Sequence, residues 1–513
     1  MKNILIVGGG SAGVMSAYTI KKLFPKKNVT LIESKNIPTV GVGESTLGHI
    51  NQWLALMGIS DEDFMKECNA SYKMSIRFEN FYSKKDGGFH YPFGQPFTKG
   101  NQAILNDWYF KKILYPKTPV SNYADMHYPI MSLVNENKIL TDEKNIAIGL
   151  ESYSFKKDVA YHFDATLFAN WLKKKFIKIG GKAKIGNIVK THKNKNGIEK
   201  VVTDKKEILK ADLFIDCTGW KSLLLGEALE EPFQSYEDML PNNSAWATKL
   251  PYTNKRKQLV PYTNCEAIEN GWVWTIPLWS RLGTGYVYSD KYISDENALK
   301  QFKKHLGRDD LNFKKLKMRV GIHNQIFVKN VCAIGMAAGF IEPLESNGLL
   351  TVHEFLIRLV RILNRPTISN FVKQQFNLSC KRFFKEFAEF VAAHYALSSR
   401  NDTQYWKDIQ NRKYKMEENF FHGNSVFQAI QQWCFNDFHY PETSGMDCIG
   451  TGMRFWPTDE HMLKYGTYNN NLDFLNNDTR ERLKQLDTRE KEWRNKVSSC
   501  PSLYDFLNKK YSE

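Results

Sequence analysis

The N-terminal segment of the chain carries glycines at a spacing that suits the binding of a dinucleotide. Residues 3–7 form a short apolar run with β-branched side chains, which is typical of a buried parallel strand. The run enters Gly8-Gly-Gly-Ser-Ala-Gly13, which fits the pattern G-x-G-x-x-G and precedes a stretch with helical spacing. A second apolar run, over residues 28–32, ends at Glu33. This order of strand, glycine turn, helix, strand and acid predicts a nucleotide-binding βαβ unit.

The residues of this unit have distinct expected tasks. Gly8 permits a tight turn, Gly10 lets the backbone approach a pyrophosphate, and Gly13 lets the helix pack closely on the strand. The free N–H groups of the helix N-terminus favour an anion. Glu33 would bind a ribose hydroxyl, and an acid here favours FAD or NAD over NADP. The alternative is an ordinary glycine-rich βα turn. The expected cofactor contacts are Gly8, Gly10, Ser11, Ala12, Gly13 and Glu33.

A glycine-containing loop follows the second strand, over residues 38–50. A flexible loop beside a nucleotide-binding fold can strap a cofactor, although a plain connector fits the pattern equally well. Ser45 or Thr46 would cap a following helix that continues through Trp53. From this loop we expect cofactor contacts at Gly43, Glu44 and Ser45.

A third segment, residues 331–348, leads from a strand through small residues into a helix. Apolar residues from Val352 to Leu363 fall on one helical face, and Pro366 follows the end of the pattern. Ser346, Asn347 and Gly348 therefore lie at a helix N-terminus, where an anion is favoured. Glu345 beside them is either a partner of the helix dipole or a catalytic carboxylate.

Two alternating segments have less decisive patterns. Residues 72–81 alternate between apolar and polar side chains, which predicts a half-buried strand on which Lys73 is solvated. In the segment 271–277, Trp272, Trp274 and Ile276 fall on one face. These side chains either wall a cofactor cavity or fill a core.

The bulk composition is that of a soluble globular protein with more than one domain. The 513 residues have a formal charge of +16, a hydrophobic fraction of 42% and a charged fraction of 25%. The lysines are spread along the chain without the aromatic-interleaved stripe of a nucleic-acid-binding protein, so we expect no nucleic-acid partner. No apolar run has the length of a membrane span. The eight cysteines are scattered singly, which predicts reduced thiols, no metal site and a cytoplasmic location.

Together the motifs resemble those of the flavin-dependent halogenases of the tryptophan-halogenase type. The resemblance extends from residue 3 to about residue 350 and is weaker beyond. The combination is specific, whereas each motif alone is not. The matching segments are Gly8-Gly-Gly-Ser-Ala-Gly13, Asn69-Ala-Ser-Tyr-Lys73, Tyr161-His-Phe-Asp-Ala165, Phe214-Ile-Asp-Cys-Thr-Gly219, Gly271-Trp-Val-Trp-Thr-Ile-Pro277, Gly285-Tyr-Val-Tyr-Ser289 and Glu342-Pro-Leu-Glu-Ser346.

The resemblance implies an α/β fold. Residues 1–350 would form an FAD-binding, Rossmann-like domain of the glutathione-reductase type with a mixed β-sheet. Its nucleotide-binding segments would be 1–50, 150–220 and 325–350, with Gly335 beside the flavin. Residues 351–513 would form a mainly helical region that binds the substrate.

The resemblance also implies a reaction and its partners. FADH2 supplied by a separate NAD(P)H-dependent flavin reductase would react with O2, and a halide ion would be oxidised to hypohalous acid. The halide would bind at Ser346, Asn347 and Gly348, and Lys73 would present the electrophile to the substrate. Glu345 would orient this electrophile or accept the proton from the halogenated ring. The wall between flavin and substrate would be formed by Trp272, Trp274, Ile276 and Pro277.

The sequence departs from the family pattern at the halide site and in the substrate region. Tryptophan-specific members usually have Ser-Thr-Gly where this chain has Ser346-Asn-Gly348. We hypothesise a looser halide site that favours bromide or iodide over chloride. The segment 439–456 lacks the expected clamp for tryptophan, so we expect an indole or phenol-like substrate in a more open pocket. The candidate substrate contacts are His90, Phe93, Phe438, His439, Tyr440, Phe455 and Trp456.

Two other functions stay open on the sequence alone. An FAD-dependent aromatic hydroxylase would share the N-terminal motif but would carry Gly-Asp where this chain has Gly335-Met336. The second alternative is a basic FAD protein that binds RNA, for which the positive charge is the only argument. The oligomeric state is also open, with a homodimer as one option.

Overall fold

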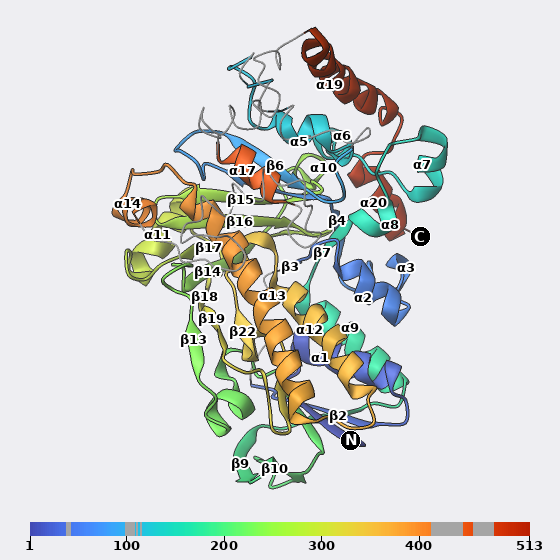
Figure 1. Ribbon diagram of the computed structural model, residues 1–513, viewed down its shortest axis with the longest axis vertical. Helices are drawn as coiled ribbons and strands as arrows, with labels where there is room; N and C mark the ends of the chain where they lie inside the picture. Colours follow the sequence, from blue (N-terminus) through green and yellow to red (C-terminus); the bar gives the residue numbers. More distant parts are fainter. Residues whose placement is uncertain are drawn as a thin grey trace, which may run out of the picture. The chain divides into compact units, whose positions relative to one another are not determined.

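The computed structural model describes residues 1–36, 43–97, 108, 111–112, 115–411, 445–454 and 477–512 (Figure 1). The chain forms two compact units, each built from three segments. Unit 1 comprises Met1–Ser71, Ala160–Tyr252 and Leu278–Ala388, and unit 2 comprises Tyr72–Val159, Thr253–Pro277 and Glu389–Glu513. These units differ from the predicted division at residue 350, because unit 2 takes up an early segment of the chain. The division into a cofactor module and a substrate region stays a prediction about function.

Unit 1 is centred on a six-stranded sheet with the strand order β20-β21-β12-β1-β2-β8. All neighbouring strands are parallel except the edge pair of β20 and β21. The predicted βαβ unit is confirmed, as is the return of the chain to this sheet in the segment 213–216. The strands are β1 Asn3–Val7, β2 Asn28–Glu33, β8 Lys182–Ile185, β12 Leu213–Asp216, β20 Phe327–Val328 and β21 Val331–Ala333.

Three helices pack beside one another in unit 1, with α1 between the other two (Figure 1). These are α1 Ser11–Leu23, α9 Ala165–Lys178 and α12 Gly348–Leu363. The predicted apolar face of α12 is buried, including Val352, Phe355, Leu356 and Leu359. Each such side chain removed from water stabilises the fold by about 1.5–3 kcal/mol, so this face fixes α12 against α1.

The remaining strands of unit 1 form smaller sheets and one further antiparallel array. The sheets have the orders β11-β10-β9 and β13-β19-β22, and the array has the order β18-β14-β17. The strand β3 pairs with β7. The bounds are β3 Glu44–Ser45, β7 Ala160–Phe163, β9 Ile188–Asn194, β10 Gly197–Thr203, β11 Ile208–Leu209, β13 Phe233–Ser235, β14 Ser244–Leu250, β17 Leu282–Tyr288, β18 Lys314–Lys317, β19 Gly321–His323 and β22 Gly339–Phe340.

Other helical segments of unit 1 are short. The helix expected after the glycine loop begins at Ile50, so neither Ser45 nor Thr46 caps it. The Thr46 hydroxyl instead donates to the Tyr161 carbonyl and accepts from the Tyr161 N–H, because Thr46 lies beside β7. The bounds are α2 Ile50–Met57, α3 Asp61–Phe64, α11 Asp295–Leu306, η1 Gly219–Lys221, η2 Leu223–Ala228, η3 Gly335–Ala337 and η4 Pro343–Glu345.

Unit 2 contains an array with the strand order β16-β15-β5-β6, in addition to most of β4. The predicted strand at 271–277 is confirmed as β16. The predicted single strand at 72–81 is interrupted at Met74, which separates β4 from β5. The strands are β4 Ser71–Lys73, which begins at the last residue of unit 1, β5 Ser75–Glu79, β6 Gly88–Pro92, β15 Tyr262–Ile268 and β16 Gly271–Pro277.

The described residues after 363 are mainly helical, as predicted. Helix α17 packs on β6, and α19 packs on α5 and α6. The helix α13 Asn370–Ala396 includes the last residues of unit 1 and the first of the final segment of unit 2. The helices of unit 2 are α5 Asn122–His127, α6 Ile130–Asn135, α7 Asp142–Ile148, α8 Phe155–Asp158, α10 Lys255–Gln258, α14 Gln404–Gln410, α17 Met446–Gly452, α19 Asn477–Lys496 and α20 Leu503–Ser512.

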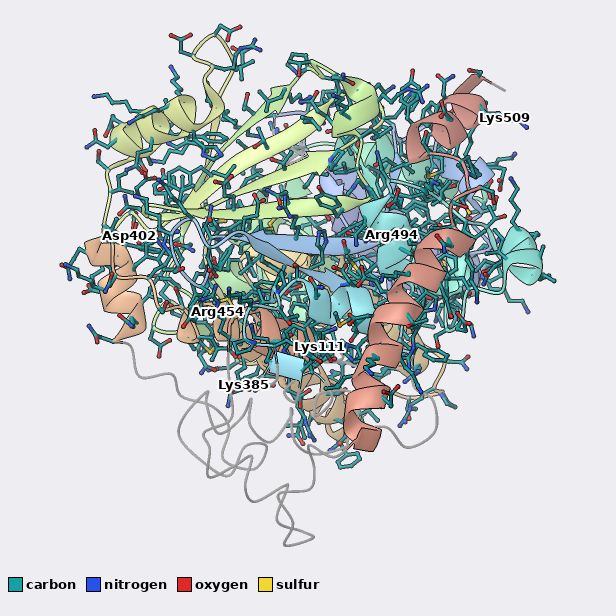
Figure 2. All side chains as sticks on the ribbon, turned by 90° about the horizontal axis from the view of Figure 1, so that it is seen from above. Lys111, Lys385, Asp402, Arg454, Arg494 and Lys509 are labelled. Atoms are coloured by element: carbon teal, nitrogen blue, oxygen red, sulfur yellow. The ribbon has the colours of Figure 1, made fainter. Side chains whose placement is uncertain are left out.

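Basic side chains of unit 2 lie on several separate elements (Figure 2). Lys111 is buried and pairs with Asp487, Arg454 pairs with Asp86, and Arg494 pairs with Glu490. These pairs neutralise part of the large positive charge locally. None of the described helices is long and apolar enough to cross a membrane.

The N-terminus of α9 provides a test of how unit 1 is stabilised. Asp164 caps this helix by accepting hydrogen bonds from the N–H groups of Thr166 and Leu167, and it also forms an ion pair with Arg281 at 2.7 Å. We expect Asp164→Ala to lower the free energy of unfolding by roughly 2–4 kcal/mol, because the cap is lost and a largely buried guanidinium loses its partner. Calorimetry would show this as a lower melting temperature.

The matched control is Ser294→Ala, which removes only the exposed cap of α11. Its expected cost is about 0.5–1 kcal/mol. Equal melting temperatures of the two variants would contradict a structural role for the ion pair of Asp164 and Arg281.

Candidate functional site

The glycine turn after β1 brings the start of α1 against the ends of two strands. Gly8 has a φ of +113°, and a Cβ added to it would lie 2.2 Å from the Cys217 carbonyl oxygen. A Cβ on Gly13 would lie 1.8 Å from the Gly8 carbonyl oxygen. Both positions therefore require glycine, one for backbone conformation and both for space. The close packing of helix and strand predicted for Gly13 is present.

The start of α1 fits a bound diphosphate. A Cβ on Gly10 would meet no atom within 4 Å, so the backbone is open at the point where a phosphate would approach. Ser11 is buried, and its Oγ has no hydrogen-bond partner among the described residues. A buried hydroxyl without a partner is costly, and a phosphate oxygen would satisfy it. The residues present thus fit FAD.

Glu33 has a partner that the sequence pattern did not reveal. Lys173 on α9 donates to Glu33 Oε1 at 2.6 Å. A Cβ on Gly9 would lie 2.1 Å from Glu33 Oε2, so the carboxylate is held between the lysine and the glycine backbone. This position at the end of β2 suits recognition of a ribose hydroxyl. No local motif identifies Lys173, because it lies on a separate helix.

Gly335 lies against the same helix start. It has a φ of +71°, and an added Cβ would lie 2.7 Å from the Cβ of Ala12. The strand β21 leads directly into this residue, so the sheet positions it. The structure therefore brings together Ala12 and Gly335, two residues predicted separately as cofactor contacts.

The segment Glu44–Ser45 of β3 connects the expected cofactor strap with the expected halide site. The Oγ atoms of Ser45 and Ser346 are 3.0 Å apart. Glu44 Oε2 would lie 3.9 Å from a Cβ on Gly348. Burial raises the pKa of Glu44 to about 7, and the charge of Asp164 adds to the shift. The residues from the two predicted segments thus meet within unit 1.

The turn before α12 arranges the candidate halide residues. Ser346 has a φ of 56° and Asn347 caps α12, which begins at Gly348. The Asn347 amide donates to the Glu342 carbonyl oxygen at 3.0 Å. The Asn347 side chain is therefore engaged with its own turn, which leaves backbone N–H groups as the natural anion donors. Glu345, immediately before the turn, is fully buried.

Lys73 is buried, with an exposed fraction of 0%. The solvated position that its alternating pattern predicted is therefore wrong, because both faces of this strand segment are covered. Its Nζ lies 4.9 Å from the centroid of the Phe93 ring, so Lys73 and Phe93 are neighbours as the predicted site requires. A cation over an aromatic face is favourable, and more so away from water.

The segment before Lys73 is anchored within unit 1. Asn69 has a φ of 54°, its Oδ1 accepts from the Ser280 N–H, and its Nδ2 donates to Ser280 Oγ. Its carbonyl also accepts from the Trp279 N–H. A left-handed residue held by three hydrogen bonds fixes the course of the chain into β4. Ser280 is a residue that the sequence did not indicate.

The tryptophans of β16 form a buried aromatic pair in unit 2. The ring centroids of Trp272 and Trp274 are 6.1 Å apart, and both side chains are buried, as is Ile276. Pro277 ends the strand. Their alternation places them on one face of β16, so a wall and a core role are both compatible with this packing.

His90 is fixed within the hairpin of β5 and β6. Its Nδ1 is 3.0 Å from Ser75 Oγ. Its ring packs edge-on against the Tyr262 ring, with 5.0 Å between the ring centroids. Burial, and to a smaller extent the charge of Arg77, lowers the pKa of His90 to about 3, so the imidazole is neutral. The other proposed substrate residues, Phe438, His439, Tyr440, Phe455 and Trp456, lie outside the described residues.

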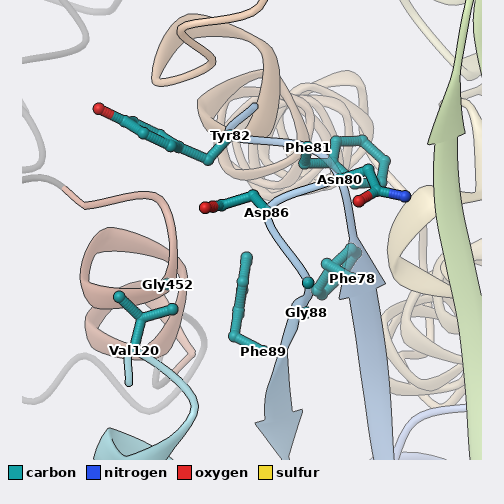
Figure 3. Close-up of a pocket in the computed structure, with 10 residues that line it drawn as sticks. Phe78, Asn80, Phe81, Tyr82, Asp86, Gly88, Phe89, Val120 and Gly452 are labelled. Atoms are coloured by element: carbon teal, nitrogen blue, oxygen red, sulfur yellow. The ribbon is translucent and has the colours of Figure 1, made fainter. Parts of the chain in front are cut away.

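A small pocket lies at the turn between β5 and β6 (Figure 3). Its lining includes Phe78, Tyr82, Asp86 and Phe89. Neither Lys73 nor the tryptophans of β16 line it. This cavity therefore belongs to the turn and not to the residues proposed for chemistry.

Two glycines of the dinucleotide turn give a paired test of cofactor binding. We expect Gly13→Ala to destabilise the protein even without FAD, because its methyl group would overlap the Gly8 carbonyl. Gly10→Ala should leave the melting temperature of the apoprotein nearly unchanged but weaken FAD binding at least about tenfold, because its methyl group enters the open side of the turn. Calorimetry and quenching of flavin fluorescence would measure the two effects. Unchanged FAD affinity in Gly10→Ala would contradict the assignment of the diphosphate site.

Comparison with known proteins agrees with this arrangement. A family model described as tryptophan halogenase matches residues 3–465. The tryptophan 6-halogenase SttH of Streptomyces toxytricini is 34% identical over 424 residues, covering 80% of this chain and 81% of SttH. The tryptophan 7-halogenase RebH of Lentzea aerocolonigenes is 33% identical over 424 residues, covering 79% and 78%.

Solved structures show the same fold over nearly the whole chain. The apo structure of VirX1 has a TM-score of 0.90 at 35% identity and covers 100% of both chains. The crystal structure of SttH has a TM-score of 0.84 at 30% identity and covers 99% of this chain and 100% of SttH. The α/β fold with an FAD-binding, Rossmann-like sheet and a helical region is thereby confirmed. The chain belongs to the tryptophan halogenase family and is a flavin-dependent halogenase.

Proposed function

We propose that the protein oxidises a halide to hypohalous acid and uses it to halogenate an electron-rich aromatic substrate at Lys73. The buried position of Lys73 beside Phe93 is the observation that carries this proposal, because a lysine without such a task is normally solvated. Glu345 is the second catalytic group. The family assignment favours this activity over an aromatic hydroxylase.

The residues of unit 1 would hold the cofactor. The diphosphate would rest on the N-terminus of α1 with Ser11 Oγ as a donor, and Glu33, held by Lys173, would accept from a ribose hydroxyl. Reduced FAD supplies the two electrons with which O2, a halide ion and a proton give hypohalous acid and water. Gly43, Glu44 and Ser45 would close over this site.

The halide would bind at the N-terminus of α12. Ser346, Asn347 and Gly348 form the turn into this helix, and the helix dipole favours an anion there. The Ser346 N–H donates to the Pro343 carbonyl, so the N–H groups of Asn347 and Gly348 are the proposed halide donors. The side chain of Asn347 is held by the Glu342 carbonyl, so the backbone determines the size of the site. We propose that this site favours bromide or iodide over chloride. Both ions are also easier to oxidise than chloride.

Lys73 would hold the oxidised halogen in one of two ways. Its ammonium can donate a hydrogen bond to hypohalous acid and polarise the oxygen–halogen bond. Alternatively, its free amine can displace water from hypohalous acid and form a nitrogen–halogen bond. In both cases the aromatic carbon gains the halogen and loses a proton, and the oxygen leaves as water. Glu345 is the proposed acceptor of that proton.

The tryptophans of β16 would keep the organic substrate away from the flavin. SttH and RebH are named for tryptophan, but for this chain we propose an indole or phenol-like substrate, contacted by His90 and Phe93. Since no second nucleotide-binding motif is present in the sequence, a separate NAD(P)H-dependent flavin reductase would supply the reduced cofactor. We further propose a cytoplasmic location.

Removal of the Lys73 amine should abolish halogenation without abolishing flavin binding. With FAD, a flavin reductase, NADH, O2, bromide and a panel of indoles and phenols, we expect Lys73→Ala to form at least about 100-fold less halogenated product. Mass spectrometry would measure the products. Lys73→Arg retains hydrogen-bond donors but lacks the free amine, so activity in this variant would favour the hydrogen-bonded form of catalysis.

The matched control is Lys111→Ala, which removes another buried lysine of unit 2. Among the described residues, Lys111 pairs with Asp487 and donates to the Met126 sulfur, neither of which is a proposed site residue, so halogenation should persist in this variant. A reaction that contains the flavin reductase and FAD but not this protein measures background halogenation. Product formation that is indifferent to Lys73, or an oxygenated product, would refute the proposal.

A competition experiment tests the halide preference. With chloride, bromide and iodide present at equal concentrations, we expect brominated and iodinated products to exceed the chlorinated one. Asn347→Thr, which restores the usual family residue, should shift the product ratio towards chloride. Chlorinated product alone would contradict the hypothesis of a looser site.

A further inference from the structure

Glu44 lies between the expected cofactor strap and the start of α12. In β3 it pairs opposite Phe163 of β7, while Ser45 pairs opposite His162. The carboxylate oxygen Oε2 would be 3.9 Å from a Cβ on Gly348, and the adjacent Ser45 Oγ is 3.0 Å from Ser346 Oγ. The Glu44 carboxyl group is therefore adjacent to the backbone that the proposed function assigns to the halide.

This carboxyl group differs from its acidic neighbour in having no compensating partner. Within the described ranges, no hydrogen-bond donor or cation pairs with the Glu44 carboxylate, whereas Asp164 is held by Arg281 and two backbone N–H groups. Burial and then the charge of Asp164 raise the pKa of Glu44 to about 7. Both protonation states are consequently populated near neutral pH.

Titratable groups also lie on the elements packed against β3. On β7, His162 is buried beside Ser71 at 3.4 Å. On α12, burial lowers the pKa of His353 to about 3, so this imidazole is neutral at the pH values considered. Asp164, which is paired with Arg281, acts on Glu44 through its charge. His49 acts on His353, and the buried Glu345 precedes the turn into α12.

We propose that Glu44 controls the charge of the halide site, so that halide binds when this carboxyl group is protonated and is repelled when it is ionised. A protonated carboxyl group can also donate its O–H to an anion, whereas a carboxylate only accepts hydrogen bonds. Like charges at such short range in a partly buried site oppose each other strongly. This inference rests on the proposed halide position at α12.

The direction of the pH dependence follows from this assignment. Below pH 7 Glu44 is mostly neutral, and halide affinity should be constant. Above pH 7 each further pH unit reduces the protonated fraction about tenfold, so the KM for bromide should rise by up to tenfold per unit. The turnover number at saturating bromide should change much less, because saturation restores the bound form.

The test compares wild type with Glu44→Gln. Glutamine is neutral at every pH and retains an N–H donor, so its KM for bromide should stay near the low-pH value of wild type from pH 6 to pH 9. We expect a ratio of wild-type to variant KM of at least about tenfold at pH 9 and near one at pH 6. Expressing the result as a ratio cancels the pH dependence of free hypohalous acid and of the reductase.

The matched control is Glu33→Gln, which makes the same chemical change in the dinucleotide site. It should weaken FAD binding while leaving the pH dependence of the bromide KM as in wild type. FAD affinity is measured for both variants, because Glu44 is also an expected cofactor contact. A change in FAD affinity of Glu44→Gln with an unaltered bromide profile would overturn the inference.

Bromide-soaked crystals of the FAD-bound protein separate the two proposals. Anomalous scattering at Gly348, together with a bromide KM of Glu44→Gln that does not change with pH, would support both the halide position and the role of Glu44. Bromide at Gly348 with a wild-type KM that does not change with pH would overturn the role of Glu44 alone. Anomalous scattering elsewhere would overturn the halide position and the role of Glu44 with it, while Lys73-dependent halogenation would remain testable.

Discussion

The contact between Gly13 and the Gly8 carbonyl is the constraint on which the cofactor half of the protein depends. Without side chains at these positions, α1 can start directly at the ends of β1 and β12. At this start Ser11 Oγ is buried without a hydrogen-bond partner among the described residues, as a phosphate donor would be before its ligand binds. Because α9 and α12 pack against α1, its placement also determines where Lys173 and the turn before α12 lie.

The sequence was sufficient to predict those helices and strands whose pattern of apolar residues fits only one kind of element. The strand at residues 3–7 and the apolar face of α12 are present as expected, since local spacing determines them. The predicted start of α2 at Ser45 or Thr46 was wrong, because the Thr46 hydroxyl forms hydrogen bonds with the backbone of Tyr161 in β7 and does not cap the helix. Such tertiary competition cannot be read from a local pattern.

The site could be predicted less completely, for reasons of burial and distance. The alternating pattern around Lys73 is the same whether one face or both faces of the strand are covered, so its burial was not predictable without the family resemblance. The partner of Glu33 is 140 residues away, and the partner of Asn69 is 211 residues away. Contacts at such separations depend on the completed fold.

The ion pair of Glu33 and Lys173 would give its two residues unequal parts in the proposed recognition of a ribose. Together their side chains carry no net charge, so attraction for a diphosphate comes from the oriented peptide groups of α1 and not from the pair. Loss of Lys173 would leave a carboxylate that still accepts from a hydroxyl. Loss of Glu33 would instead release an ammonium group beside the ribose, which is the chemistry that recognises a phosphorylated sugar. A single substitution at the acid would thus change the pair from neutral to positively charged.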